Sequence, residues 1–171
     1  MKALILVDFE NEWIDRHSDY FVGNISKTIE RVNKLIDFCR KDRYKIIFTT
    51  HAEKGSKDAF VPNSDSVKII KAIHKKDSDI LITKYKINPF FKTNLEKELN
   101  GINDIVVCGI LTNLCVRSLI EDAYDMEFNI TVIKDCCVAR DKKTYDFTFK
   151  DLKSFREEIN FVNVNQFVKF T

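Results

Sequence analysis

Cys115 is the residue of this sequence with the clearest capacity for covalent chemistry. It follows an apolar run, Ile105 to Cys108, and a single glycine, Gly109, and is preceded closely by Thr112 and Asn113. The run is short enough for a buried strand, glycine allows a sharp bend, and threonine and asparagine favour helix N-termini. The pattern predicts a strand, a turn and a helix whose first turn contains Cys115.

Such a position would suit a nucleophilic thiol. Unpaired amide groups and the positive end of the helix dipole stabilise a thiolate relative to a thiol. The same amides could receive the oxyanion that forms when a thiolate attacks a carbonyl group. A cysteine in a helix is, however, commonly a small buried apolar residue, so its position alone leaves both interpretations open.

Asp8 and Lys84 could supply the proton chemistry that a thiol nucleophile needs. Asp8 directly follows the apolar run Ala3 to Val7, and Lys84 follows the run Asp79 to Thr83. A carboxylate beside a thiol can take its proton and return it to a leaving amine. A neighbouring ammonium would keep that carboxylate ionised and favour the thiolate. Taken singly, the aspartate could merely cap a turn and the lysine could be a solvated charge, but the three groups together suffice for acyl transfer without a metal or cofactor.

The elements that must position these residues alternate along the chain. Strands are predicted at 3–7, 44–49, 79–83, 105–108, 130–133 and 161–164, and helices at 24–41, 65–73, 90–99, after 112 and at 144–157. Alternating strands and helices predict an α/β fold, a three-layer α/β/α arrangement with a doubly wound, mainly parallel sheet of about six strands. Ligands bind beyond the carboxyl ends of such strands, and those ends carry Asp8, His51, Lys84, the Cys115 turn and Asp135.

Two segments without clear periodicity are expected to border the pocket. Residues 9–23 are rich in aromatic side chains, and residues 52–64 contain Gly55 and Pro62 and form the best candidate for a lid. Trp13 and Phe90 are candidate pocket walls, although aromatic residues are more often part of the core.

Length and composition narrow the class of protein. We expect one domain over residues 1–171. With 28 Lys and Arg against 26 Asp and Glu, spread along the chain, nothing predicts a nucleic-acid surface. No run approaches the roughly 20 apolar residues of a membrane span. Five cysteines without a CxxC pair are typical of reduced thiols in a cytoplasmic protein.

Three runs of this sequence resemble the isochorismatase-like cysteine hydrolases, which include nicotinamidases and N-carbamoylsarcosine amidases. The runs are Val-Asp-Phe-Glu-Asn-Glu-Trp at 7–13, Ile-Thr-Lys at 82–84 and Cys-Gly-Ile-Leu-Thr-Asn-Leu-Cys-Val at 108–116. The resemblance runs from about residue 2 to 139 and is most specific at 109–116. It implies that Asp8 is the general base, Lys84 its charged neighbour and Cys115 the nucleophile. It also implies a cis peptide between Ile110 and Leu111, with the amides of Leu111 and Cys115 directed at the oxyanion.

The sequence departs from the nicotinamidase pattern at several positions. Nicotinamidases bind a metal through an Asp-x-His pair and further histidines, whereas here His51 is retained, Thr49 replaces the aspartate and Lys57 occupies the place of a second histidine. One imidazole is a poor divalent site, so we expect neither metal nor other cofactor. Glu10 stands where the family commonly has glutamine, which places Glu10 and His51 among the candidate pocket residues.

The resemblance implies a hydrolase of a small-molecule amide or related C–N bond, acting through a thioester and assembled as a homo-oligomer. Isochorismatase-type or other non-amide hydrolysis, and a non-catalytic oligomeric scaffold, remain alternatives. A phosphatase of the haloacid dehalogenase type is a weaker one, because Glu10 stands where that mechanism needs an aspartate.

Overall fold

A six-stranded parallel sheet forms the centre of the molecule in the computed structural model, which describes residues 1–170. The strands are β1 (Lys2–Val7), β2 (Lys45–His51), β3 (Ile80–Lys84), β4 (Asp104–Gly109), β5 (Asn129–Ile133) and β6 (Asn160–Val162), and they lie in the order β3-β2-β1-β4-β5-β6. Each adjacent pair is parallel. The predicted α/β class and doubly wound sheet are confirmed.

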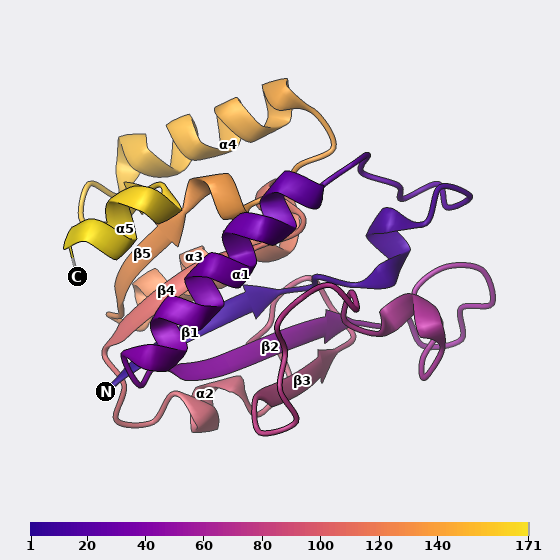
Figure 1. Cartoon of the computed structure of the whole chain (residues 1–171), viewed down its shortest axis with the longest axis horizontal. Coiled ribbons are helices and arrows are strands. Elements are labelled where there is room, and N and C mark those ends of the chain that lie inside the picture. The colour runs from indigo at the N-terminus through magenta and orange to yellow at the C-terminus, as the bar shows by residue number, and fades with distance from the viewer. Residues whose placement is uncertain (171) are drawn as a thin grey trace.

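The helices that link the strands flank this sheet. They are α1 (Ser26–Lys41), α2 (Leu95–Glu98), α3 (Arg117–Asp125), α4 (Lys142–Phe155) and α5 (Val164–Phe170). Crossovers between parallel strands are right-handed, so the chain winds one way from β1 to β2 and the other way from β4 to β5, and α1 and α3 lie on opposite faces. Figure 1 shows α1 in front of the sheet with α5 beside it, where Phe38 and Phe167 meet edge to face at 5.7 Å.

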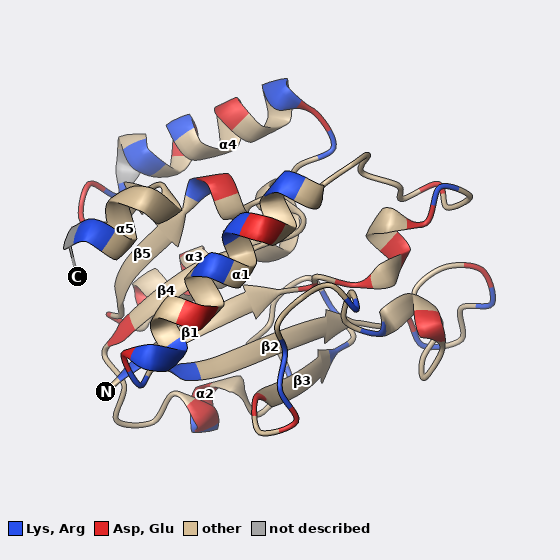
Figure 2. Cartoon of the chain, in the orientation of Figure 1, with Lys and Arg blue, Asp and Glu red and all other residues tan. Residues whose placement is uncertain are grey.

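The apolar runs form strands because a parallel sheet covered on both faces admits near-continuous apolar sequence. Residues Ala3 to Val7 of β1 are completely inaccessible to solvent. Charged residues lie mainly on the helices, the connections and the strand ends (Figure 2). No helix within residues 1–170 combines the length and apolar character needed to cross a bilayer.

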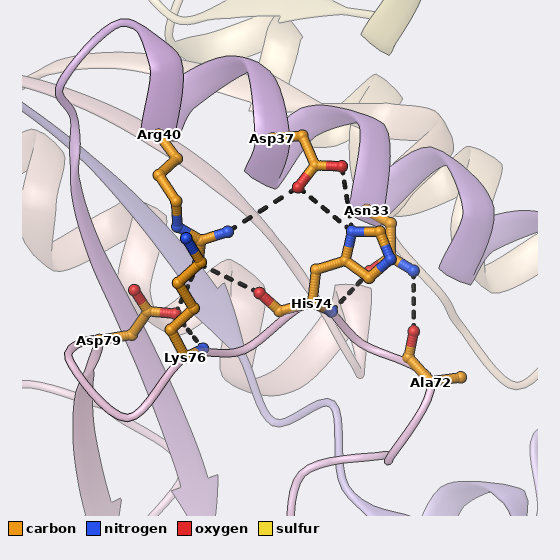
Figure 3. Close-up of polar contacts among 7 residues, drawn as sticks. All are labelled: Asn33, Asp37, Arg40, Ala72, His74, Lys76 and Asp79. Atoms are coloured by element: carbon orange, nitrogen blue, oxygen red, sulfur yellow. Dashed lines mark hydrogen bonds and ion pairs between the residues drawn. The ribbon is translucent and has the colours of Figure 1, made fainter.

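The predicted helix at 65–73 is wrong: that stretch holds one short 3-10 turn, Asp65–Val67, followed by irregular chain. Side chains of α1 form hydrogen bonds with the backbone of residues 72–74, which follow this 3-10 turn (Figure 3). Asn33 donates to the carbonyl of Ala72 and accepts from the amide of His74, each at 2.8 Å, and Arg40 donates to the carbonyl of His74 at 3.1 Å. These side-chain bonds satisfy backbone groups that a helix would otherwise satisfy internally.

Two further elements differ from the expected ones. The helix predicted at 90–99 is reduced to α2, because the Thr93 hydroxyl accepts from the amide of Leu95 and fixes a later start. The helix α5 was not predicted. The remaining predicted strands and helices are present with ends shifted by a few residues.

Candidate active site

Asp8 lies immediately beyond the end of β1, with no exposed surface. Its backbone has a φ of 54°, which turns the chain sharply as it leaves the strand. One carboxylate oxygen, Oδ1, accepts a 2.6 Å hydrogen bond from the hydroxyl of Thr49 on β2. The other, Oδ2, lies 2.7 Å from the ammonium of Lys84. Both carboxylate oxygens are therefore fixed by neighbouring strands.

Lys84, the last residue of β3, brings the three predicted catalytic residues together. Its side chain is also fully buried, and its Nζ lies 3.2 Å from the sulfur of Cys115 as well as touching Asp8. Burial works to lower the pKa of Lys84, but the charge of Asp8 and the contacts with Asp8 and Cys115 outweigh it and raise that pKa above its usual value. The ammonium therefore remains charged at neutral pH.

The turn that carries Cys115 depends on a close approach between β4 and β1. A side chain at Gly109 would place its Cβ 2.4 Å from the carbonyl oxygen of Val7, which only glycine avoids. The next peptide bond, between Ile110 and Leu111, is cis. Cys115 then lies in a single π-helical turn, Thr112–Val116, directly before α3 and not in the first turn of a regular helix. Such turns recur at functional sites.

Cys115 is a protonated thiol at neutral pH. Its exposed fraction is 7%, and burial, followed by the negative charge of Asp8, raises the pKa of the thiol to about 12, against the opposing effect of Lys84. The sequence had indicated a thiolate favoured by the helix dipole. Desolvation of the sulfur and the charge of the adjacent carboxylate act in the opposite direction and raise the pKa of the thiol.

A cavity of about 360 Å³ opens in front of the sulfur. Of the predicted pocket residues, Trp13 and His51 border it, as do Leu111 and Cys115 of the predicted oxyanion turn. The other residues that border it were not predicted from the sequence; they are Tyr20, Glu53, Phe60, Ile87, Asn113, Leu114, Arg140, Asp141 and Thr144. Tyr20, Glu53 and Phe60 lie in the loops 9–23 and 52–64, which were expected to border a pocket. Their place in these loops was the sequence signal that could have identified them.

Aromatic rings form the wall of this cavity opposite the turn. Trp13 contacts Phe60 with ring centroids 5.0 Å apart, and Tyr20 contacts Phe60 at 4.9 Å. The ring of His51 meets Phe60 at 5.2 Å. Burial and the charge of Lys84 lower the pKa of His51, so its imidazole is neutral at neutral pH.

Five of the predicted site residues do not border the cavity: the completely buried pair Asp8 and Lys84, and the three described next. The side chain of Phe90 is partly buried and packs against the core. Ile110 is completely buried under the turn. Glu10 is also completely buried, and its carboxylate accepts a hydrogen bond from the backbone amide of His51. Burial and the charge of Asp8 raise the pKa of Glu10 well above its usual value.

The residues near His51 do not fit a divalent metal centre. Thr49 faces Asp8 and donates its hydroxyl to it, and His51 Nε2 lies 3.6 Å from Glu53. Across residues 1–170, no group of three or more His, Cys, Asp or Glu side chains is arranged to hold a metal ion.

Comparison with known proteins identifies the family. Residues 2–160 match the isochorismatase domain. This chain belongs to the isochorismatase family of hydrolases. The family member YddQ of Bacillus subtilis, an uncharacterized protein, is 25% identical over 138 residues, covering 79% of this chain and 76% of the relative.

Solved structures of isochorismatase-like hydrolases share the fold of the present chain over nearly its whole length. A family protein from Desulfovibrio vulgaris superposes with a TM-score of 0.90 at 17% identity, covering 98% of this chain and 96% of the other. The N-carbamoylsarcosine amidase of Thermoplasma acidophilum superposes with a TM-score of 0.82 at 23% identity, covering 95% and 96%.

Proposed function

We propose that this hydrolase cleaves the C–N bond of a small-molecule amide, with Cys115 as nucleophile, Asp8 as general base and acid, and Lys84 as the charged group that holds both. The observation that carries the proposal is the single buried ammonium of Lys84, which lies 2.7 Å from Asp8 and 3.2 Å from the sulfur at the floor of a cavity. The fold shared with an amidase supports the choice of an amide.

The raised pKa of the thiol defines the first step. Because Cys115 is neutral at rest, its proton passes to Asp8 as the sulfur attacks the amide carbonyl. The S–C bond forms, and the carbonyl oxygen takes the negative charge. In this step the amides of Leu111 and Cys115 donate to that oxygen, a role supported by the position of both residues at the border of the cavity.

The second step returns the proton. Asp8 protonates the departing nitrogen, the C–N bond breaks, and ammonia or an amine leaves a thioester on Cys115. Asp8, again a carboxylate, then takes a proton from a water molecule that attacks the thioester. The S–C bond breaks, Asp8 returns the proton to the sulfur, and the acid product is released. Lys84 stabilises Asp8 when it is ionised and the sulfur when it is a leaving thiolate.

A substrate screen tests this proposal. Small primary amides and ureido compounds are incubated with the wild-type protein and with Cys115→Ala, and release of ammonia is measured. We expect release only from the wild-type protein, and an acyl adduct on Cys115 in intact-protein mass spectra. Ammonia release that persists in Cys115→Ala, or a magnesium-dependent phosphatase activity in that variant, would overturn the cysteine mechanism.

The proposal extends to the setting of the enzyme, which we place in the cytoplasm as a homo-oligomer. All five cysteines are free and buried, as suits a reducing compartment. On α4, Phe147 has 63% of its surface exposed and offers an apolar contact for another copy. Light scattering after gel filtration of the wild-type protein and of Phe147→Asp tests whether the protein is a homo-oligomer. A monomeric wild-type protein would contradict it.

A further inference from the structure

A second, larger cavity lies beside the one that contains Cys115. Its volume is about 740 Å³, and we call it the lysine groove. It is bordered by the lysines Lys54, Lys86 and Lys92 and by the apolar side chains Tyr85, Ile87 and Phe91. All six are exposed, and they come from the segment that follows β2 and the segment that follows β3.

The two cavities are adjacent and share bordering residues. His51, Glu53 and Ile87 border both. Lys84 connects them as well, because its Nζ lies 3.4 Å from Nδ1 of His51 and donates to the backbone carbonyl of Lys86 at 3.3 Å, while it also touches the sulfur of Cys115. The groove therefore adjoins the cavity that contains the sulfur, and the buried Lys84 contacts both that sulfur and the backbone of a groove residue.

The charge of the lysine groove is positive and not neutralised by the protein. Within residues 1–170, none of its three lysines pairs with a carboxylate. Instead, Nζ of Lys54 lies 4.7 Å from the ring centroid of Tyr85, and Nζ of Lys92 lies 5.3 Å from that of Phe91. Glu53 is the one acidic residue among the described residues that border the groove, and it is next to His51, with Oε1 3.6 Å from Nε2.

We propose that the lysine groove is a substrate subsite for an anionic group, so that the preferred substrates are amides whose acyl chain ends in a carboxylate. The inference rests on the proposed amidase function. The apolar side chains of the groove would contact the methylene stem, and the lysine ammonium groups would contact the terminal carboxylate.

Arg140, which borders the smaller cavity, is less available for this purpose. Its guanidinium donates to the backbone carbonyl of Asp19 and lies 5.9 Å from the ring centroid of Tyr20. These contacts occupy it with the loop 9–23. The free positive charge near the sulfur is thus concentrated in the groove.

Two amides of equal chain length test the charge preference. Hexanamide and adipamate have the same reactive end, but only adipamate carries a terminal carboxylate. We expect the ratio of their kcat/KM values to favour adipamate in the wild-type protein, and to fall about tenfold when Lys54, Lys86 and Lys92 are replaced by glutamine, since each exposed charge contact contributes little and three add up. The loss should appear mainly in KM, and added salt should reduce the wild-type preference.

A matched control replaces three exposed lysines distant from the groove, Lys27, Lys150 and Lys153, by glutamine. This control changes the net charge equally and should leave the ratio unchanged. A ratio that falls equally in both triple variants, or that falls in Arg140→Gln and not in the groove variant, would overturn the inference while leaving the amidase proposal standing.

A binding measurement separates the inference from the proposed activity. Trp13 is the only tryptophan and borders the smaller cavity, so its fluorescence can report ligand entry in the Cys115→Ala protein. Adipate should bind more tightly than neutral adipamide, and the groove variant should remove that difference. If this result holds while no amide is hydrolysed, the amidase proposal fails and the anionic subsite survives. If adipate binds no better than adipamide, the subsite is refuted.

Discussion

The buried pair of Asp8 and Lys84 makes Lys84→Met a sharp test of the site. The two charged groups lie 2.7 Å apart and neither side chain is exposed. Methionine preserves much of the volume of lysine but removes the ammonium, which leaves the carboxylate of Asp8 buried with neutral neighbours, the hydroxyl of Thr49 and the thiol of Cys115. Breaking a buried ion pair by removing one partner costs about 3–5 kcal/mol. We expect Lys84→Met to lower the free energy of unfolding by that amount.

The double variant Asp8→Asn/Lys84→Met tests the reason for this loss. Both charges are then absent, and a neutral pair of similar volume is often no less stable than a buried ion pair. The double variant should therefore lose less stability than the sum of the two single variants. Lys45→Met is the control, because Lys45 and Glu98 form a partly exposed pair at 2.9 Å whose loss should cost about 1 kcal/mol or less.

Urea denaturation at neutral pH, followed by far-ultraviolet circular dichroism, measures the stability of the wild-type protein and of the four variants. A loss below about 1 kcal/mol for Lys84→Met, similar to that of the control, would show that the pair is not held in a desolvated state. Strict additivity of the two single substitutions would show that Asp8 and Lys84 do not interact energetically. Either result would refute the geometry on which the proposed mechanism depends.

Three further substitutions or treatments test other parts of the site. Because the pKa of Cys115 is raised to about 12, its alkylation by iodoacetamide should become about a hundredfold faster between pH 8 and 10, against roughly fourfold for an ordinary thiol. Asp8→Asn should accelerate this alkylation at pH 8. Cys115→Ala measures the background labelling of the other cysteines. Gly109→Ala should lose about 3 kcal/mol in urea denaturation, since its Cβ would lie 2.5 Å from Cβ of Val7. Burial and the charge of Asp8 raise the pKa of Glu10, so the stability that Glu10 contributes is complete below its unfolded pKa and is lost as pH rises through the folded value. Glu10→Gln should accordingly be more stable than the wild-type protein near pH 8, with a smaller difference near pH 4, and equal stabilities at both would contradict the buried proton.

The sequence predicted the sheet and the meeting point of the candidate catalytic side chains because both depend on strong local patterns. Continuous apolar runs mark strands buried on two faces, and parallel strands end at one edge. Pairing of His51 with Lys84, and of Val7 with both Thr49 and Gly109, aligns these ends in the structure. Asp8, Lys84 and the Cys115 turn meet there although they are far apart in the sequence.

The pocket wall and the state of the thiol could not be predicted in the same way. Tyr20, Phe60 and Arg140 lie in loops whose course is fixed by individual contacts and not by a periodic pattern. The charge state of Cys115 depends on how completely the sulfur is desolvated and on its distance from Asp8, which only the tertiary structure defines.

Thr49 explains how the site tolerates its unusual density of acidic groups. Asp8 and Glu10 are both completely buried, and the negative charge of Asp8 already raises the pKa of Glu10. An aspartate at position 49, as in the metal-binding pattern, would place a third carboxylate against Asp8 with only the ammonium of Lys84 to balance them. A threonine there offers a donor in place of a charge, and its 2.6 Å hydrogen bond fixes Oδ1 of Asp8 while Oδ2 is left to face Lys84. The threonine that stands in place of a metal-binding aspartate therefore fixes the orientation of the carboxylate that we propose as the general base.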